Sequence, residues 1–287
     1  MSNRDSRKNN TDTIYSTLTN QFFIIAGPCV IENYDICAEV CEKLKKLSEK
    51  EGFYYIFKSS YDKANRLSLN SFRGPGITQG LKILEKIKSE FGVPVLTDVH
   101  ETNQIEETAD IVDIIQIPAF LCRQTDLVVK SAKTGKIINI KKGQFMAPED
   151  MKYIVEKVKN SGNNKIILTE RGTSFGYHNL VVDFRSILIM KSFCELVIYD
   201  ATHSLQYPGG AGGKSAGARF AIEPLLYASL PVGINGLFME IHPNPPRAMS
   251  DSATQINLND IQRILRNVKI LLTVRKKLKM IYNTPRE

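Results

Sequence analysis

The stretch Leu196-Val-Ile-Tyr-Asp-Ala-Thr-His203 begins as an apolar run and ends in polar side chains that can bind a metal. A strand buried in a parallel sheet is a nearly continuous run of Val, Ile and Leu, and this stretch fits that description. It predicts a buried strand with His203 at its carboxyl end. Because α/β barrels keep their active sites at the carboxyl ends of the strands, His203 indicates where the chemistry should lie.

Seven similar runs occur elsewhere in the chain, which makes eight predicted strands. They are Phe22–Cys29, Tyr54–Lys58, Val93–Asp98, Ile114–Pro118, Ile137–Lys141, Lys165–Arg171 and Gly236–Glu240. Helical patterns with apolar residues three or four positions apart lie between them, and a last one covers 259–280. Regular alternation of strand and helix indicates parallel pairing. Eight such units in about 250 residues predict an α/β fold of the (β/α)8 TIM barrel type.

The barrel is predicted to be one catalytic domain, residues 21–287, preceded by a flexible N-terminal arm, residues 1–20. No apolar run approaches the roughly 18 residues of a membrane span, and the first twenty residues are too polar for a signal peptide. The five cysteines at irregular positions indicate free thiols in a reducing compartment. We therefore expect a cytoplasmic protein with no membrane partner.

The net charge of +8 is compatible with anionic partners. Lys and Arg are scattered over helical faces without interleaved aromatic residues or a nucleic-acid-binding motif, which disfavours nucleic acid. A small anionic substrate explains the charge equally well.

Most of the predicted strand ends carry a charged or metal-binding side chain. These positions are Cys29, Lys58, Asp98, Pro118, Lys141, Arg171, His203 and Glu240. Gathering cations and metal ligands at one rim is costly unless something binds there. The ring as a whole therefore predicts a ligand site at the mouth of the barrel.

Four of the side chains could meet at one metal ion: Cys29, His203, Glu240 and Asp251. The first and last strands are neighbours in a closed barrel, so their loops converge. A thiolate, an imidazole and two carboxylates suit Fe(II), Zn, Mn or Co better than Mg or Ca. His242 is a rival ligand, although Pro243 suggests that the strand has already ended.

The cations Lys58, Lys63, Arg66, Lys141 and Arg171 exceed what one phosphate needs, so two anionic groups are expected. The glycine-rich segment 208–215 resembles the end of a phosphate-binding loop. Pro208 occupies the place of the required first glycine, however, and the glycines are better explained as a mobile lid.

Several motifs together resemble the 3-deoxy-D-manno-octulosonate 8-phosphate synthases, over about residues 20 to 275. The motifs are Ala26-Gly-Pro-Cys29, Lys58-Ser-Ser-Tyr-Asp-Lys-Ala-Asn-Arg66, Arg73-Gly-Pro-Gly76, Pro118-Ala-Phe-Leu-Cys-Arg-Gln-Thr-Asp126, Lys141-Lys-Gly-Gln-Phe145 and Asp200-Ala-Thr-His203. The segment Lys63-Ala-Asn-Arg66 separates this family from the related 3-deoxy-arabino-heptulosonate 7-phosphate synthases, which usually carry a Lys-Pro-Arg-Thr type segment.

The resemblance implies a homotetrameric transferase of lipopolysaccharide biosynthesis. Such an enzyme condenses phosphoenolpyruvate with D-arabinose 5-phosphate and water, giving 3-deoxy-D-manno-octulosonate 8-phosphate and phosphate. The residues that it assigns to phosphoenolpyruvate are Ser60, Lys63, Ala119, Lys141, Gln144 and Arg171, and those for the sugar phosphate are Asn65 and Arg66. Lys58 and Asp98 would line the reacting centre, so the expected catalytic group is Lys58, Asp98, Lys141 and His203.

The same resemblance divides the family into metal-dependent and metal-independent enzymes. The second group has Asn where this chain has Cys29, so the chain is expected to be metal-dependent. Leu67 is a departure, because many relatives have Ser there beside the phosphate-binding arginine.

Three alternatives stay open at this point. A 3-deoxy-arabino-heptulosonate 7-phosphate synthase would prefer the shorter erythrose 4-phosphate, and a metal-dependent aldolase would form the same bond without releasing phosphate. A non-catalytic sugar-phosphate-binding barrel would keep the cations but need no metal cluster.

Overall fold

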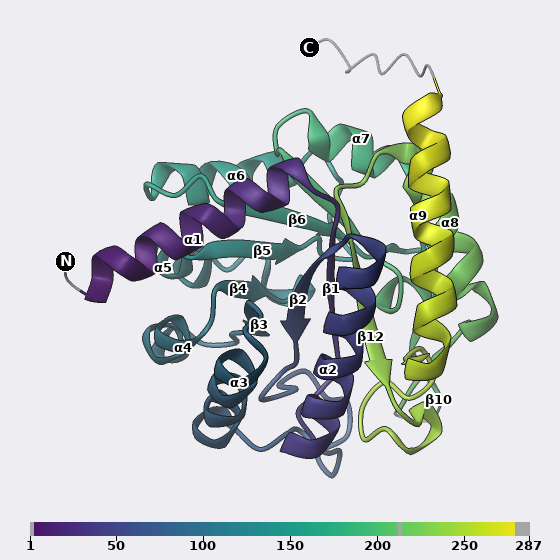
Figure 1. Cartoon of the computed structure of the whole chain (residues 1–287), viewed down its shortest axis with the longest axis horizontal. Coiled ribbons are helices and arrows are strands. Elements are labelled where there is room, and N and C mark those ends of the chain that lie inside the picture. The colour runs from purple at the N-terminus through teal and green to yellow at the C-terminus, as the bar shows by residue number, and fades with distance from the viewer. Residues whose placement is uncertain (1–2, 212–213, 279–287) are drawn as a thin grey trace.

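Eight parallel strands close into a barrel in the computed structural model, which describes residues 3–211 and 214–278 (Figure 1). They are β1 Phe23–Gly27, β2 Tyr54–Lys58, β3 Val95–Asp98, β4 Ile114–Ile117, β5 Ile137–Lys141, β6 Ile166–Glu170, β9 Leu196–Asp200 and β12 Gly236–His242. The strands follow this order around the sheet, and β1 pairs with β12 to close it. The predicted (β/α)8 TIM barrel is confirmed.

Every pairing between these strands is parallel, so all eight carboxyl ends lie at one rim of the barrel. The register that closes the barrel places Gly27 opposite Glu240. Cys29, two residues beyond Gly27, therefore lies near the end of β12. A short strand, β13 Ile256–Asn257, pairs with the end of β12 at Ile241 and His242.

Helices surround the barrel and cover its outer face (Figure 1). They are α2 Tyr34–Glu51, α3 Ile77–Phe91, α4 Ile105–Ile111, α5 Thr125–Lys133, α6 Met151–Asn160, α7 Arg185–Lys191, α8 Ile222–Val232 and α9 Ile261–Lys277. None of the described helices is both long enough and apolar enough to cross a bilayer.

Helix α2 illustrates why these segments form where they do. Asn33 caps its first turn by accepting a hydrogen bond from the amide of Ile36, and Gly52 ends it in the left-handed conformation at φ 83°. The apolar residues that recur every three or four positions form the buried stripe that faces the strands.

The N-terminal segment differs from the flexible arm that the sequence suggested. Residues Asn3–Asn20 form helix α1, which lies across the amino end of the barrel (Figure 1). Ile14 and Leu18 are buried there in one apolar cluster with inward-facing strand residues such as Phe23 and Ile137. The segment is polar apart from a few residues, but those few fall on one face and close the barrel.

The glycine-rich segment begins in β10 Gln206–Ala211, which pairs antiparallel with β11 Lys214–Gly217. Gly212 and Gly213, which belong to the predicted lid, lie outside the described residues. A second short hairpin, β7 Thr173–Ser174 with β8 Leu180–Val181, stands beside it at the same rim. His178 connects the two, since its Nδ1 lies 2.5 Å from the carbonyl oxygen of Pro208.

Candidate active site

A cavity of about 900 Å³ opens at the carboxyl rim of the barrel. Many of the residues singled out in the sequence line it: Lys58, Lys63, Asn65, Arg66, Asp98, Ala119, Lys141, Gln144, Arg171, His203 and Asp251. Three others, Cys29, Ser60 and Glu240, are fully buried and do not line it. One site therefore brings together the ends of all the strands that the sequence pointed to.

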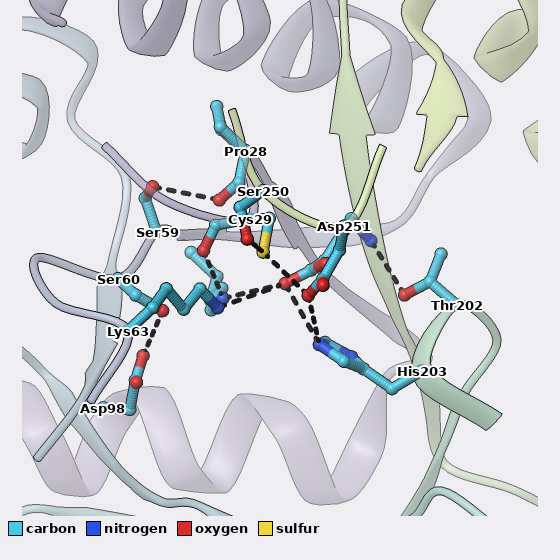
Figure 2. A network of polar contacts seen from close by, with 12 residues as sticks. Pro28, Cys29, Ser59, Ser60, Lys63, Asp98, Thr202, His203, Ser250 and Asp251 are labelled. Carbon is cyan, nitrogen blue, oxygen red and sulfur yellow. Dashed lines mark hydrogen bonds and ion pairs between the residues drawn. The ribbon is translucent and has the colours of Figure 1, made fainter. Parts of the chain in front are cut away.

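A thiol and two carboxylates lie beside this cavity. Cys29, Glu240 and Asp251 each offer one ligand atom, and these atoms are all within 4.8 Å of one another. The Sγ of Cys29 lies 3.2 Å from Oδ2 of Asp251 and 2.8 Å from the hydroxyl of Ser250. Figure 2 shows Cys29, Asp251 and His203 converging from three different segments of the chain.

Glu240 is the most crowded member of the group. Its Oε1 lies 3.2 Å from Nζ of Lys58, 3.7 Å from Nζ of Lys63 and 3.3 Å from Nε2 of His203. Burial would raise the pKa of Glu240, but His203 and the lysines outweigh it and hold the pKa well below its usual range. Its Oε2 is buried and has no hydrogen-bond partner, so the carboxylate still has an unused ligand atom.

His203 lies beside this group of three, outside the set whose ligand atoms are all within 4.8 Å of one another, and it does not sit at the strand's tip. Strand β9 ends at Asp200, and His203 begins a short 3-10 helix, His203–Leu205. Its Nδ1 lies 2.7 Å from Asp200 Oδ2, so Nε2 is the nitrogen that faces Glu240 and, at 3.8 Å, Asp251. A carboxylate behind a histidine in this way fixes the ring and its tautomer for metal binding.

Asp200 is a functional candidate that the sequence reasoning overlooked. It is fully buried, and it also accepts hydrogen bonds from Lys141 and from the backbone amides of Thr202 and His203. Burial would raise the pKa of Asp200, but His203 and Lys141 lower it far below the usual range. The available signal was its place at the end of an apolar run, as the first residue of the motif that ends at His203.

These groups fit a divalent metal. Burial, together with the charges of Asp251 and Glu240, raises the pKa of the Cys29 thiol well above its ordinary value, and a cation among them would favour the thiolate. The unpartnered Oε2 of Glu240 supplies a free donor. Sulfur, nitrogen and oxygen donors in one cluster suit Fe(II), Zn, Mn or Co.

His242 does not join this cluster. The sequence left it as a rival ligand, but its Nε2 lies 3.4 Å from Oε1 of Glu32. Strand β12 also runs two residues further than predicted and ends at His242, directly before Pro243.

The cavity also holds a cationic group of side chains that is incompletely paired. Arg171 Nη1, Arg66 Nη2 and Gln144 Oε1 are buried atoms without a hydrogen-bond partner. Burial lowers the pKa of Lys141 to about 8, despite the attraction of Asp200. Burial works against the charge on Lys63, but Cys29 and the carboxylates around it raise its pKa. The unpaired buried donors of Arg171 and Arg66 are suited to an anionic ligand, and the Gln144 oxygen can accept a hydrogen bond from one.

Lys58 and Asp98 lie between the two regions. Lys58 donates to the carbonyl oxygen of Cys29 at 3.1 Å as well as contacting Glu240. Asp98 accepts from the Ser60 hydroxyl and lies 2.9 Å from Nε2 of His100. Despite burial, His100 and the lysines hold the pKa of Asp98 far below its usual range. His100, two residues beyond the end of β3, is a second residue that the sequence reasoning missed.

Lys141, the last residue of β5, and Lys142, which follows it, have different surroundings. Lys141 lines the cavity, with its Nζ 3.2 Å from the ring centroid of Phe238. Lys142 is fully buried, donates to Thr173 at 2.9 Å and lies 3.7 Å from Glu170. Successive residues of a strand point to opposite faces, which explains why only Lys141 reaches the cavity.

The chain matches the sequence model of the DAHP synthetase I family over residues 7–276. It belongs to that family. Relatives named 2-dehydro-3-deoxyphosphooctonate aldolase are also similar. The one from Fusobacterium nucleatum subsp. nucleatum is 53% identical over 246 residues, which cover 86% of this chain and 88% of the relative. The one from Geobacter sp. (strain M21) is 53% identical over 86% of this chain and 90% of the relative. A third, from Nitratidesulfovibrio vulgaris (strain DP4), is 48% identical over 91% of this chain and 95% of the relative.

The part of the chain that matches the family includes the segments that form the cavity. The match runs from helix α1 to the last turn of α9, so it includes every strand whose end contributes to the site. The family match therefore covers every segment that contributes a residue to the cavity.

Proposed function

We propose that the chain is a 3-deoxy-D-manno-octulosonate 8-phosphate synthase. It condenses phosphoenolpyruvate with D-arabinose 5-phosphate and water and releases phosphate. The observation that carries this proposal is the 53% identity to relatives named 2-dehydro-3-deoxyphosphooctonate aldolase over most of both chains. The cavity supports it, because one rim combines anion-binding cations with a cluster that can hold a metal.

In the proposed reaction, C3 of phosphoenolpyruvate attacks the aldehyde carbon of the sugar and forms the new carbon–carbon bond. Water adds at C2, and the bond from C2 to the phosphate oxygen breaks with the electron pair leaving on phosphate. The water oxygen stays on C2 as the new carbonyl oxygen, while one of its protons goes to the aldehyde oxygen and the other to the departing phosphate. The protein's task is to hold two anions that repel each other in line for this step.

The residues of the cavity share this task. Arg171, Lys141 and Gln144 offer buried cations and an amide for phosphoenolpyruvate, and Lys63 adds a further positive charge. Asn65 and Arg66 lie on the segment after β2 and would bind the phosphate of the sugar. The bonding atoms then meet near Lys58 and Asp98, between the cationic end and the metal cluster.

We propose further that the enzyme is metal-dependent, with Cys29, His203, Glu240 and Asp251 as ligands. A bound divalent ion would supply a Lewis acid or a template for the aldehyde or the water. Asp200 would hold His203 in the tautomer that presents Nε2, and the buried thiol and carboxylates would provide the negative charge that retains the ion. Fe(II), Zn, Mn and Co are the candidates on donor type.

The homotetramer and the cytoplasmic location stay part of this proposal. The family resemblance supports the homotetramer. The second is supported by the resemblance and by the free thiols of all five cysteines.

Phosphate release tests the reaction. Purified protein with phosphoenolpyruvate and arabinose 5-phosphate should release one phosphate for each eight-carbon sugar acid phosphate formed. Bond formation without phosphate release would indicate an aldolase instead, and binding of both substrates without turnover would indicate a binding barrel.

Replacing arabinose 5-phosphate by erythrose 4-phosphate tests the choice within the family. A site whose polar groups match the longer sugar leaves them unpaired with the shorter one, so kcat/KM should fall on the order of 10⁴-fold. Comparable values for the two sugars would contradict the assignment.

A further inference from the structure

His242 and Glu32 form a pair close to the proposed metal cluster but outside it. The backbone amide of Asn244 donates to Nδ1 of His242 at 2.9 Å. An amide can only donate here, so Nδ1 is the unprotonated nitrogen and Nε2 carries the hydrogen. Nε2 lies 3.4 Å from Oε1 of Glu32, and both side chains are at most 9% exposed. The backbone thus holds His242 with Nε2 facing the Glu32 carboxylate, although at 3.4 Å the two atoms form no hydrogen bond.

Glu32 uses the same oxygen to hold a second segment of the chain. Its Oε1 accepts a hydrogen bond of 2.9 Å from the backbone amide of Met249, 217 residues away in sequence. Burial alone would raise the pKa of Glu32, but the contacts with His242 and Met249 lower it. The carboxylate therefore stays charged where it joins the loop after β1 to the loop after β12.

The turn that Glu32 holds contains Asp251, one of the proposed ligands. Asp251 has φ 45°, in the left-handed region that residues with a Cβ rarely adopt. Such a conformation persists only when its surroundings impose it. Gln255 holds the turn from the other side, because its side-chain amide donates to the carbonyl oxygen of Ser250 at 2.7 Å.

We propose that Glu32, oriented by His242, is a positioning residue that fixes the turn Met249–Asp251 and thereby presents Asp251 to a divalent ion. The inference rests on the metal site of the proposed function. It assigns His242 to the support of a ligand rather than to the ion itself, and it makes the loop after β1 contribute both Cys29 and the brace for Asp251.

Cobalt binding tests the proposal without any turnover. Metal-free protein is titrated with Co²⁺, and both the affinity and the visible spectrum are recorded. Groups that orient metal ligands typically affect affinity 10- to 100-fold, so Glu32→Ala should weaken Co²⁺ binding by about that factor. The sulfur-to-cobalt charge-transfer band should persist, because Lys58 and Ser60, which lie outside the turn, hold the backbone of Cys29. The ligand-field bands should change with the loss of Asp251.

A double-mutant cycle shows whether Glu32 acts through Asp251. Asp251→Gly removes the ligand and suits the positive φ, so it provides the background for the cycle. If Glu32 only positions Asp251, adding Glu32→Ala to Asp251→Gly should change Co²⁺ affinity no further. Additive losses would overturn the proposal.

Two milder variants cover the case in which Glu32→Ala does not fold. Glu32→Gln keeps an oxygen acceptor for the Met249 amide, so it should lose less affinity than Glu32→Ala. His242→Asn keeps an acceptor for Asn244 but removes the ring N–H that faces Glu32, so a severalfold loss is expected. Wild-type Co²⁺ affinity in both folded variants would overturn the proposal.

Glu51→Gln is the matched control, because Glu51 is also a nearly buried glutamate in an ion pair, with Lys269 at 3.4 Å, at the carboxyl end of α2. It should bind Co²⁺ as the wild type does, and an equal loss there would contradict a specific role for Glu32. Wild-type protein that binds no metal would overturn this inference and the metal site together. Metal binding without phosphate release would overturn the proposed reaction alone.

Discussion

The two ends of the barrel are filled by opposite kinds of side chain. At the amino end, Ile14 and Leu18 of α1 pack on inward-facing residues such as Ile137 in an entirely apolar cluster. At the carboxyl end, Lys58 and Glu240 are equally buried, with exposed fractions of 1% and 0%. Burying apolar groups stabilises the fold, whereas burying ions costs free energy that their pairing only partly returns.

This contrast separates stability from function along the axis of the barrel. Within the described residues, the cluster beneath α1 consists of apolar side chains such as Phe23 and Ile137. The carboxyl end keeps unpartnered atoms on Glu240, Gln144 and Arg171 that a ligand could satisfy. We therefore expect substitutions at one end to change stability and substitutions at the other to change activity.

The largest effect should follow from removing the thiol at the carboxyl end. Cys29→Ala should lose metal and activity together, because the ion contributes several kcal/mol of transition-state stabilisation, or about 10³-fold in rate. Cys29→Asn should keep some turnover in chelator, since its amide can hydrogen-bond what the ion had held. Rates of both variants with and without chelator check this, and equal, negligible turnover in the two would show that Cys29 does not determine metal dependence.

At the amino end, Leu18→Ala should destabilise the protein by about 3 kcal/mol, the usual cost of a cavity left by a buried leucine. Its kcat/KM should match the wild type at temperatures where it stays folded, because α1 and the cavity lie at opposite rims. Urea unfolding gives the first quantity and phosphate release the second. Ser16→Ala, on the exposed side of the same helix, is the control. A large loss of kcat/KM in folded Leu18→Ala would break the separation between the two ends.

Arg171→Lys should lower activity and leave stability nearly unchanged, the reverse of Leu18→Ala. The variant keeps a positive charge but loses the paired donors of the guanidinium, including the buried Nη1. We expect kcat/KM for phosphoenolpyruvate to fall roughly 10- to 100-fold, or about 1.4 to 2.8 kcal/mol, with little change in unfolding free energy. Arg185→Lys, which alters an exposed arginine paired with Asp183, should leave kcat/KM unchanged. Unfolding at much lower urea in Arg171→Lys would contradict the prediction.

The smallest expected effect is the change of kcat/KM with pH. Because burial lowers the pKa of Lys141 from 10.5 to about 8, this group loses its proton in the free enzyme as pH rises through 8. The charge that holds phosphoenolpyruvate then disappears, and kcat/KM should fall about tenfold per pH unit above that value. Between about 8 and 10.5 the unfolded chain binds more protons than the folded one, so this group's contribution to stability rises with pH. A flat kcat/KM profile from pH 7 to 10 would show that Lys141 does not titrate in this range.

The barrel itself could be predicted because each strand is a short, nearly uninterrupted apolar run. Strands β2 and β5 have the predicted limits, and β12 is two residues longer than predicted. Strands β6 and β9 stop before the polar residues that prolonged the predicted runs, and β1, β3 and β4 are each limited by a proline, which lacks the N–H that a ladder needs. Helix α1 was not predicted, since its few apolar residues gain a burial partner only once the barrel exists. Local sequence carries no trace of that tertiary contact.

The charged residues of the site were found because they stand where apolar runs stop. Their geometry was not predictable in the same way. Asp200 looked like part of a strand, and only the folded chain shows it bonded to both Lys141 and His203. Likewise, the spacing of Glu240 and His242 did not tell which of them faces the cluster. In the folded chain His242 faces Glu32, which is more than two hundred residues away in sequence, and Glu240 faces the cluster.

The pairing of β1 with β12 has a consequence for when the site comes into being during synthesis. Cys29 and Asp251 touch although they are 222 residues apart, so the thiol emerges from the ribosome long before its carboxylate neighbours. Until β12 and the turn after it have been translated, a passing metal ion meets one isolated sulfur rather than a chelating set. If these residues bind a metal as proposed, high-affinity loading has to wait for barrel closure, and a prematurely terminated chain that lacks β12 is expected not to retain the ion.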